Sequence, residues 1–78
     1  MVYCKLISVT NRIVRYAIGG YVNDITGELI LHRDTNEYEV VKVPENSKVY
    51  RTHIECMLHK HFKEFQKGIF KEKIAYEI

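Results

Sequence analysis

Residues 48–67 read KVYRTHIECMLHKHFKEFQK, and they show the clearest periodicity in the chain. Apolar side chains recur in this segment at the helical spacing of about 3.6 residues. Asn46 and Ser47 before it favour helix N-caps, and Gly68 after it suits a C-cap. We therefore predict one long amphipathic helix, whose packing face holds Tyr50, Ile54, Met57, Leu58, Phe62 and Phe65.

The segments on both sides of the predicted helix are rich in β-branched and aromatic residues, as is typical of strands. Pro44 cannot donate to a sheet ladder, so the last strand before the helix should end near it. The fold class predicted for residues 1–78 is a single two-layer α+β domain in the order β-β-β-β-α-β, with a mainly antiparallel sheet of about five strands. The predicted strands are residues 2–9, 12–22, 28–33, 37–43 and 70–78.

Composition limits the class of protein. A chain of 78 residues has room for one hydrophobic core, and a hydrophobic content of 46% excludes disorder. No apolar run approaches the roughly 20 residues of a membrane span, and the first residues do not resemble a secretion signal. We therefore expect a cytoplasmic location, with Cys4 and Cys56 as buried thiols. The bias toward Lys, Ile, Tyr and Glu suits a low-GC genome, such as that of a Gram-positive bacterium or its phage.

The predicted sheet has apolar residues on both faces. Around residue 16, Val14 and Ile18 share one side of the strand, while Ile13 and Ala17 point to the other. One helix can cover only one face, so either the sheet curls into a small barrel or a second copy or foreign protein covers the rest. The expected protein interface, on the uncovered face, consists of Tyr3, Val14, Tyr16 and Ile18.

Basic residues are concentrated in the C-terminal part. Residues 1–46 carry five basic and six acidic side chains, whereas residues 47–78 carry seven basic and four acidic. A lysine stripe could neutralise phosphates beside stacking aromatic rings, although a net charge of +2 is low for a nucleic-acid binder and solvated helix lysines are common. This alternative site consists of Lys60, Lys63, Lys67 and Lys71.

Histidine and cysteine are frequent in the helix, but their spacing does not predict a metal site. His59 and His61 point in nearly opposite directions on a helical wheel, and Cys56 lies on a third side. His61 falls among the apolar residues, so we expect it to be buried and hydrogen-bonded to a tyrosine or to the backbone. If it is buried and neutral, the fold should lose stability as the pH falls through the histidine range. No nucleotide-binding or catalytic motif occurs, so no enzyme activity, cofactor, metal or small-molecule ligand is expected.

These observations favour a non-enzymatic interaction protein, such as a regulator, adaptor or inhibitor. Its expected partner is another protein or a second copy, bound through an apolar sheet face or a sheet edge. Nucleic-acid binding through the lysine stripe is the alternative.

Overall fold

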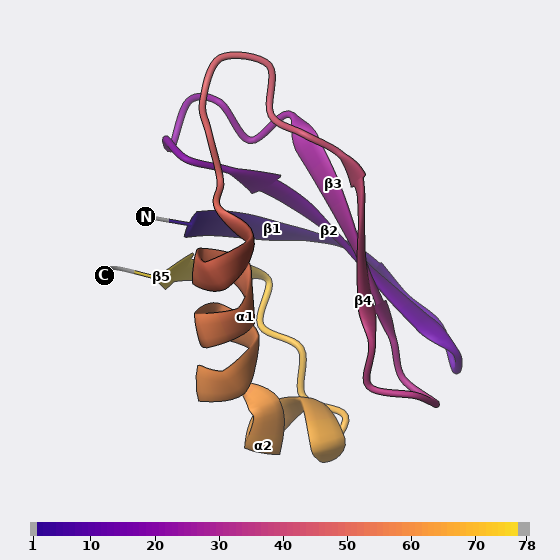
Figure 1. Cartoon of the computed structure of the whole chain (residues 1–78). Helices are drawn as coiled ribbons and strands as arrows, with labels where there is room; N and C mark the ends of the chain where they lie inside the picture. The colour runs from indigo at the N-terminus through magenta and orange to yellow at the C-terminus, as the bar shows by residue number, and fades with distance from the viewer. Residues whose placement is uncertain (1, 77–78) are drawn as a thin grey trace.

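The computed structural model describes residues 2–76, which form a five-stranded antiparallel sheet with two helices packed against it (Figure 1). The predicted α+β class is confirmed. Along the chain the elements are β1 (Val2–Val9), β2 (Ile13–Gly19), β3 (Gly27–His32), β4 (Tyr38–Lys42), α1 (Arg51–Lys60), α2 (Phe62–Gln66) and β5 (Lys73–Tyr76).

The strands lie in the order β4-β3-β2-β1-β5, and every neighbouring pair is antiparallel. Short connections explain most of this order, because two tight turns and one longer loop, residues 20–26, join the first four strands into a meander. The last strand returns from the helices to the opposite side of β1, where Val2 pairs with Tyr76. Asn36 has a φ of 60° in the β3–β4 turn, a conformation that asparagine tolerates better than most residues.

The core lies between the helices and one face of the sheet. Alternate residues of β1, β2 and β3 point toward α1, as expected where one face of an antiparallel sheet is buried. The buried apolar side chains are Val2, Cys4, Val14, Tyr16, Ile18, Leu29, Leu31, Ile54, Met57 and Ile74.

The helical segment is not one long helix, and this detail of the prediction is wrong. It begins at Arg51 rather than at Lys48, and an irregular turn at His61, with φ −99° and ψ 7°, separates α1 from α2. Tyr50 occupies the N-cap position without a side-chain cap, so the predicted capping by residues 46 and 47 is also wrong. Gly68 has a φ of 79°, as expected for a residue that ends a helix.

The helices cover the face on which the sequence predicts the interface. Val14, Tyr16 and Ile18 are each at most 1% exposed, so the prediction that they lie on an uncovered face is wrong. The physical reason is Arg15, which has the same orientation as Ile13 and Ala17 and would leave a charge in the core if that face were covered.

The far face of the sheet carries charge rather than a continuous apolar surface. Arg15 forms an ion pair of 3.3 Å with Glu28, and His32 lies 4.0 Å from Glu39. Lys5 is exposed, and its ladder partners Ala17 and Lys73 show that it points to the same face. Charged side chains from every strand therefore point to the face that lies opposite the helices, and it is not the apolar docking surface expected from sequence.

A buried carboxylate ties the β2–β3 loop to the segment between β4 and α1. Asp24 accepts hydrogen bonds from the Asn46 backbone at 3.0 Å and from the Thr26 hydroxyl at 3.0 Å. The Ser47 hydroxyl accepts a hydrogen bond of 2.9 Å from the Gly20 amide. These bonds fix the path by which the chain leaves the sheet and reaches α1.

Candidate functional site

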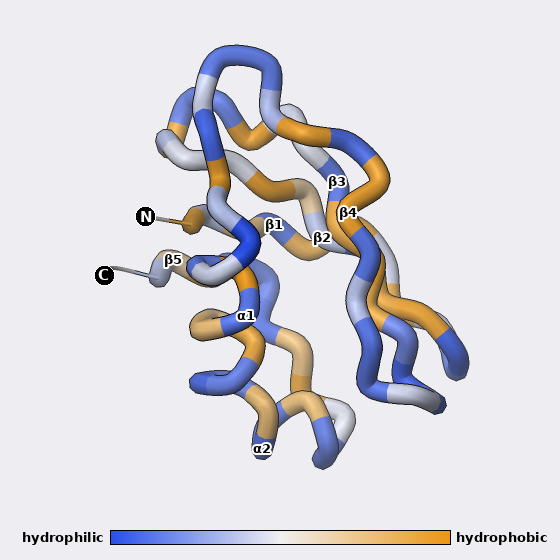
Figure 2. Tube along the Cα trace, viewed as in Figure 1, coloured by the Kyte–Doolittle hydropathy of each residue, from blue (hydrophilic) through white to orange (hydrophobic). Residues whose placement is uncertain are grey.

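The single layer of helix is too narrow for the sheet. A helix is about 10 Å wide and strands are spaced about 4.8 Å apart, so one helix covers roughly two strands. Figure 1 shows α1 beside β1 and β5, with β4 on the other side of the view. Figure 2 shows hydrophobic segments in β4 and in the chain that follows it, at this less covered side of the molecule.

An apolar groove lies between β4 and the first turns of α1. Its volume is about 370 Å³, within the range of small binding sites. Val40 contributes the wall on the strand, and Ile54 contributes the wall on the helix. The residues that line the groove are Ile18, Tyr38, Val40, Val43, Pro44, Val49, Arg51 and Ile54; we call it the β4 groove.

Tyr38 ties the two walls of the β4 groove together. Its phenol donates a hydrogen bond of 2.9 Å to Glu55 on α1 and accepts one of 3.0 Å from the Arg51 guanidinium. Arg51 also bonds to Glu55 at 3.3 Å, one turn along the helix. Burial and the hydrogen bond to Glu55 raise the pKa of the Tyr38 phenol, whereas Arg51 opposes this change. The phenol is therefore protonated at neutral pH and can donate.

β4 is also an edge strand. It is paired only with β3, so the backbone groups on its outer side have no strand partner among residues 2–76. The valines of β4 are unusually accessible, with exposed fractions of 38% for Val40 and 51% for Val41, and Val43, just after the strand, is 70% exposed. An available edge beside an apolar groove is the arrangement by which sheets accept an additional strand.

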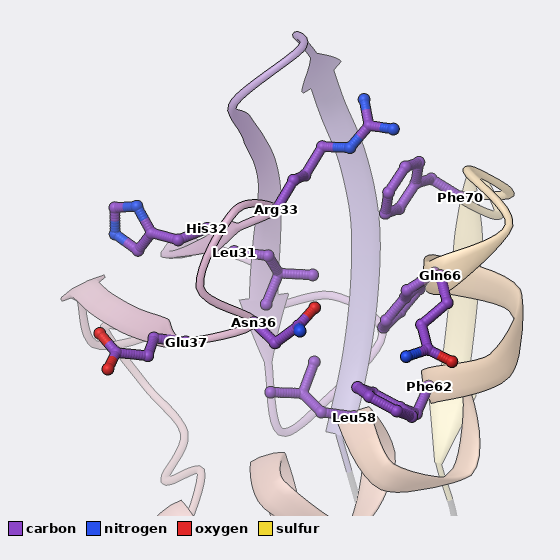
Figure 3. Close-up of a pocket in the computed structure, with 10 residues that line it drawn as sticks. Leu31, His32, Arg33, Asn36, Glu37, Leu58, Phe62, Gln66 and Phe70 are labelled. Atoms are coloured by element: carbon purple, nitrogen blue, oxygen red, sulfur yellow. The ribbon is translucent and has the colours of Figure 1, made fainter.

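A second cleft lies at the other end of the helices, between α2 and the β3–β4 turn (Figure 3). Its volume is about 290 Å³, and Leu31 and Leu58 form part of its floor. The chain has three phenylalanines, and all of them line this cleft: Phe62, Phe65 and Phe70. The Phe65 and Phe70 rings are stacked with their centroids 5.4 Å apart. We call this feature the phenylalanine cleft.

Arg33 lies at the rim of the phenylalanine cleft. Its guanidinium carbon is 5.1 Å from the centre of the Phe70 ring, and one nitrogen donates to the Thr10 carbonyl at 2.8 Å. No carboxylate of residues 2–76 lies within ion-pair distance of it. The cleft therefore combines aromatic surface with a positive charge that is held in place.

The predicted lysine stripe is exposed but divided. Lys71 lies 3.6 Å from the Glu64 carboxylate, and the Lys60 ammonium lies 5.6 Å from the centre of the Tyr76 ring. Lys63 is on α2 and Lys67 is its C-cap residue, and each follows by one position a residue that lines the phenylalanine cleft. The structure thus gives Lys60 an aromatic neighbour and Lys71 a carboxylate neighbour, whereas Lys63 and Lys67 lie on α2 and directly after it.

Tyr3 is separated from the other three predicted interface residues. It is half-buried and its ladder partners are Gly19 and Ala75, which places it on the far face of the sheet. A shallow surface hollow joins it to Tyr21 and Lys48. The structure therefore does not bring Tyr3 together with Val14, Tyr16 and Ile18.

The predicted burial of His61 is confirmed, but its partner is a carboxylate. His61 Nδ1 lies 3.0 Å from Glu64, and the hydrogen bond to His61, followed by the charge of Lys71, lowers the pKa of Glu64. The sequence led us to expect a tyrosine or a backbone group as the partner of His61, and the structure has a carboxylate in that place.

The other reactive side chains of the described residues lie apart from one another. Within residues 2–76 no three His, Cys, Asp or Glu side chains come close enough to hold a metal ion. Cys4 is buried, and burial raises the pKa of its thiol to about 12, so it is unreactive at neutral pH. Cys56 is exposed, which corrects the prediction that both thiols are buried; it lies on the outer surface of α1.

The candidate site residues that sequence reasoning missed are in β4 and at the β3–β4 turn. The available signal was the run Val40-Val41-Lys42-Val43, in which apolar residues do not alternate regularly before Pro44. Comparison with family models, curated proteins and solved structures finds no match to this chain. In the part of the chain described, neither helix has the length and apolar character needed to cross a membrane.

Proposed function

We propose that this chain is a small, non-enzymatic protein-interaction module that binds an extended protein segment along the outer edge of β4. The bound strand would pair with the backbone of β4, and its apolar side chains would enter the β4 groove. The observation that carries this proposal is the position of Val40. It belongs to an edge strand whose outer side has no strand partner among residues 2–76, and it also forms a wall of an open apolar groove.

Two further features support binding rather than catalysis. The groove walls are mostly aliphatic, and the polar groups nearest to it, Tyr38, Arg51 and Glu55, already bond to one another. Every buried side-chain nitrogen or oxygen within residues 2–76 has a hydrogen-bond partner, so no unsatisfied polar group of the interior points to a reacting molecule. A role as regulator, adaptor or inhibitor is consistent with such a surface.

Affinity capture with matched variants tests this proposal. The bait proteins are the wild type, Val40→Asp at the groove, and Ile7→Asp, which places the same charge at an exposed apolar residue of β1. We expect a protein that is recovered by the wild type and by Ile7→Asp but not by Val40→Asp. Far-UV circular dichroism checks that each bait is folded. A partner that binds all three baits equally, or complete absence of association, contradicts the proposal.

A second candidate function is binding of single-stranded nucleic acid at the phenylalanine cleft. The observation that favours it is the Arg33 guanidinium, 5.1 Å from the centre of the Phe70 ring in this cleft, because bases stack on aromatic rings while cations contact phosphates. Lys63 and Lys67 each follow a residue that lines the cleft and could supply further positive charge. Binding of labelled oligonucleotides at about 50 mM salt measures it. Lys63→Glu/Lys67→Glu should abolish binding, whereas Lys5→Glu/Lys73→Glu makes the same change in net charge on the far face and should have a smaller effect.

A further inference from the structure

The edge of β4 contains a bulge that changes which side chains share a face. Leu29 pairs with Val40 and Glu28 pairs with Lys42, so Val41 is an additional residue with no partner on β3. Glu39 pairs with Ile30, which lies on the same face of β3 as Glu28. Glu39 and Lys42 therefore point to the same face of the sheet, although they are three positions apart and a regular strand would place them on opposite faces.

We propose that the partner at the β4 edge is a second copy of this chain, paired through β4 in an antiparallel arrangement. In this dimer Glu39 of each copy lies opposite Lys42 of the other, and the two-fold axis passes between Val40 and Val41. The two sheets become one continuous ten-stranded sheet. This inference rests on the proposed function, because it names the protein that binds the β4 edge.

Charge selects this register. Residues directly opposite in an antiparallel pair point to the same face. Within β4, Glu39 and Lys42 point to the far face, whereas Tyr38 and Val40 point toward the helices. In a β4–β4 pair, Glu39 and Lys42 can therefore lie opposite each other or opposite their own equivalents. Two of the three possible registers place Glu39 against Glu39, or Lys42 against Lys42, and both repel. Only the register with Glu39 opposite Lys42 matches the faces and pairs opposite charges, and the two-fold axis forms this pair twice.

The bulge also favours a second copy over a regular strand. A bulged edge disrupts pairing with an ordinary strand, which is one way in which proteins protect their edges. A second β4 has the additional residue at the equivalent position, so the irregular parts of both strands meet at the two-fold axis. Val40 and Val41 of each copy then pack across the axis and lose the exposure that they have in the single chain.

The contacts of Glu39 and Lys42 within one chain do not prevent them from pairing with a second copy. Glu39 lies 4.0 Å from His32, and Lys42 lies 3.7 Å from Glu45, and all four side chains are more than one-third exposed. Such surface contacts are weak and can rearrange. A five-residue strand buries less than the area of about 800 Å² per partner that is usual for stable complexes, so the dimer is expected to be weak and concentration-dependent.

Charge reversal in solution tests the register. Sedimentation equilibrium over a range of concentrations compares the wild type, Glu39→Lys, Lys42→Glu, the double variant Glu39→Lys/Lys42→Glu, and an equimolar mixture of the two single variants. In each single variant both pairs become repulsive, and we expect its dimer Kd to rise about ten-fold or more. The double variant should associate as the wild type does. The mixture should also associate, because one chain then has lysine at both paired positions and faces a chain that has glutamate at both.

Three results would overturn the dimer: a wild type that stays monomeric at millimolar concentration, single variants that associate as strongly as the wild type, or a mixture that does not recover association. Amide hydrogen exchange of residues 39–42 provides a second measurement, because pairing should slow exchange of the outer amides as concentration rises. A monomeric wild type that still captures a foreign protein in a Val40-dependent manner would refute the dimer and leave the proposed function intact. If that capture also fails, both proposals are wrong.

Discussion

The phenol of Tyr38 on β4 donates a 2.9 Å hydrogen bond to the carboxylate of Glu55 on α1. It links a strand at the sheet edge to a helix that mainly covers other strands, and it crosses the β4 groove. The width of the groove therefore depends on a contact between two partly exposed side chains.

Replacing Tyr38 with phenylalanine should loosen this end of the sheet. The variant keeps the ring but removes the bonds to Glu55 and Arg51, so we expect the free energy of unfolding in urea to fall by about 0.5–1 kcal/mol. The substitution should speed amide hydrogen exchange in β4 more than in β2, relative to the wild type. Tyr50→Phe is the control, because the Tyr50 side chain is half-exposed and lies outside this network. Equal effects of the two substitutions would show that the Tyr38 bonds do not stabilise the fold.

Tyr16 should make the protein sensitive to alkali. Its side chain is 1% exposed, its hydroxyl donates to the Lys71 carbonyl at 2.9 Å, and burial, followed by the nearby Cys4 and Glu64, raises its pKa from 10.0 to about 12. A pKa raised by folding favours the neutral phenol, so its contribution is complete below pH 10 and is lost as the pH rises toward 12.

We expect Tyr16→Phe to lower the free energy of unfolding at pH 7 by about 1 kcal/mol, because the Lys71 carbonyl loses its donor. The variant should also lose less stability than the wild type between pH 9 and 11. Tyr21→Phe, at a side chain that is 62% exposed, should change neither quantity. Identical alkaline profiles of Tyr16→Phe and the wild type would contradict the role of this phenol.

Asp24 should make the protein sensitive to acid. Hydrogen bonds from Ser47, Thr26 and Asn46 hold its pKa below the ordinary value of 3.8. A lowered pKa means that this group stabilises the fold above that pH and that the contribution is lost as the pH falls through the folded-state pKa. Asp24→Asn should be less stable at pH 7 and should show a flatter stability profile between pH 5 and 2. Asp34→Asn, in the exposed β3–β4 turn, should retain the wild-type profile.

Gly19 should not tolerate any side chain. A Cβ at this position would lie 1.9 Å from the Asp24 carbonyl oxygen, and the backbone there cannot move without breaking the bonds of Asp24. We expect Gly19→Ala to lower the free energy of unfolding by about 2 kcal/mol or more. At Gly20 the closest atom is the Ser47 side chain, at 3.0 Å, so Gly20→Ala should cost less. Thermal unfolding of the two variants measures the difference, and a larger loss at Gly20 would contradict this geometry.

The local structure was largely predictable because it depends on neighbouring residues. Residues 34–36 have side chains that favour turns, and Asn36 in this turn has a positive φ. The glycine after the helix, Gly68, also has a positive φ, as expected for a residue that ends a helix. The helical period placed Ile54 and Met57 on the packing face, and both are buried. The break at His61 was not predictable, because no proline or glycine interrupts the helical pattern there.

The covered face of the sheet was predicted incorrectly, although the sequence contained the relevant signal. Both sides of β2 have apolar residues, and counting them does not distinguish the faces. Arg15 does, because covering Ile13 and Ala17 would also bury a guanidinium, whereas Val14, Tyr16 and Ile18 contain no charge. The β4 groove was not predictable, because it depends on how α1 lies relative to the sheet edge. That placement involves bonds between residues far apart in the sequence, such as Tyr38 with Glu55 and Asn46 with Asp24.

The pairing of β5 with β1 also affects how this protein is made in the cell. Ile74 is part of the core and the Lys71 carbonyl accepts the bond from Tyr16, so the interior lacks essential contacts until the ribosome has released residues 71–76. During synthesis the meander β1–β4 has neither its fifth strand nor its helical cover, and its apolar face is accessible. Folding is therefore expected to be completed after translation of this segment, and chaperones have a period in which they can bind the nascent chain.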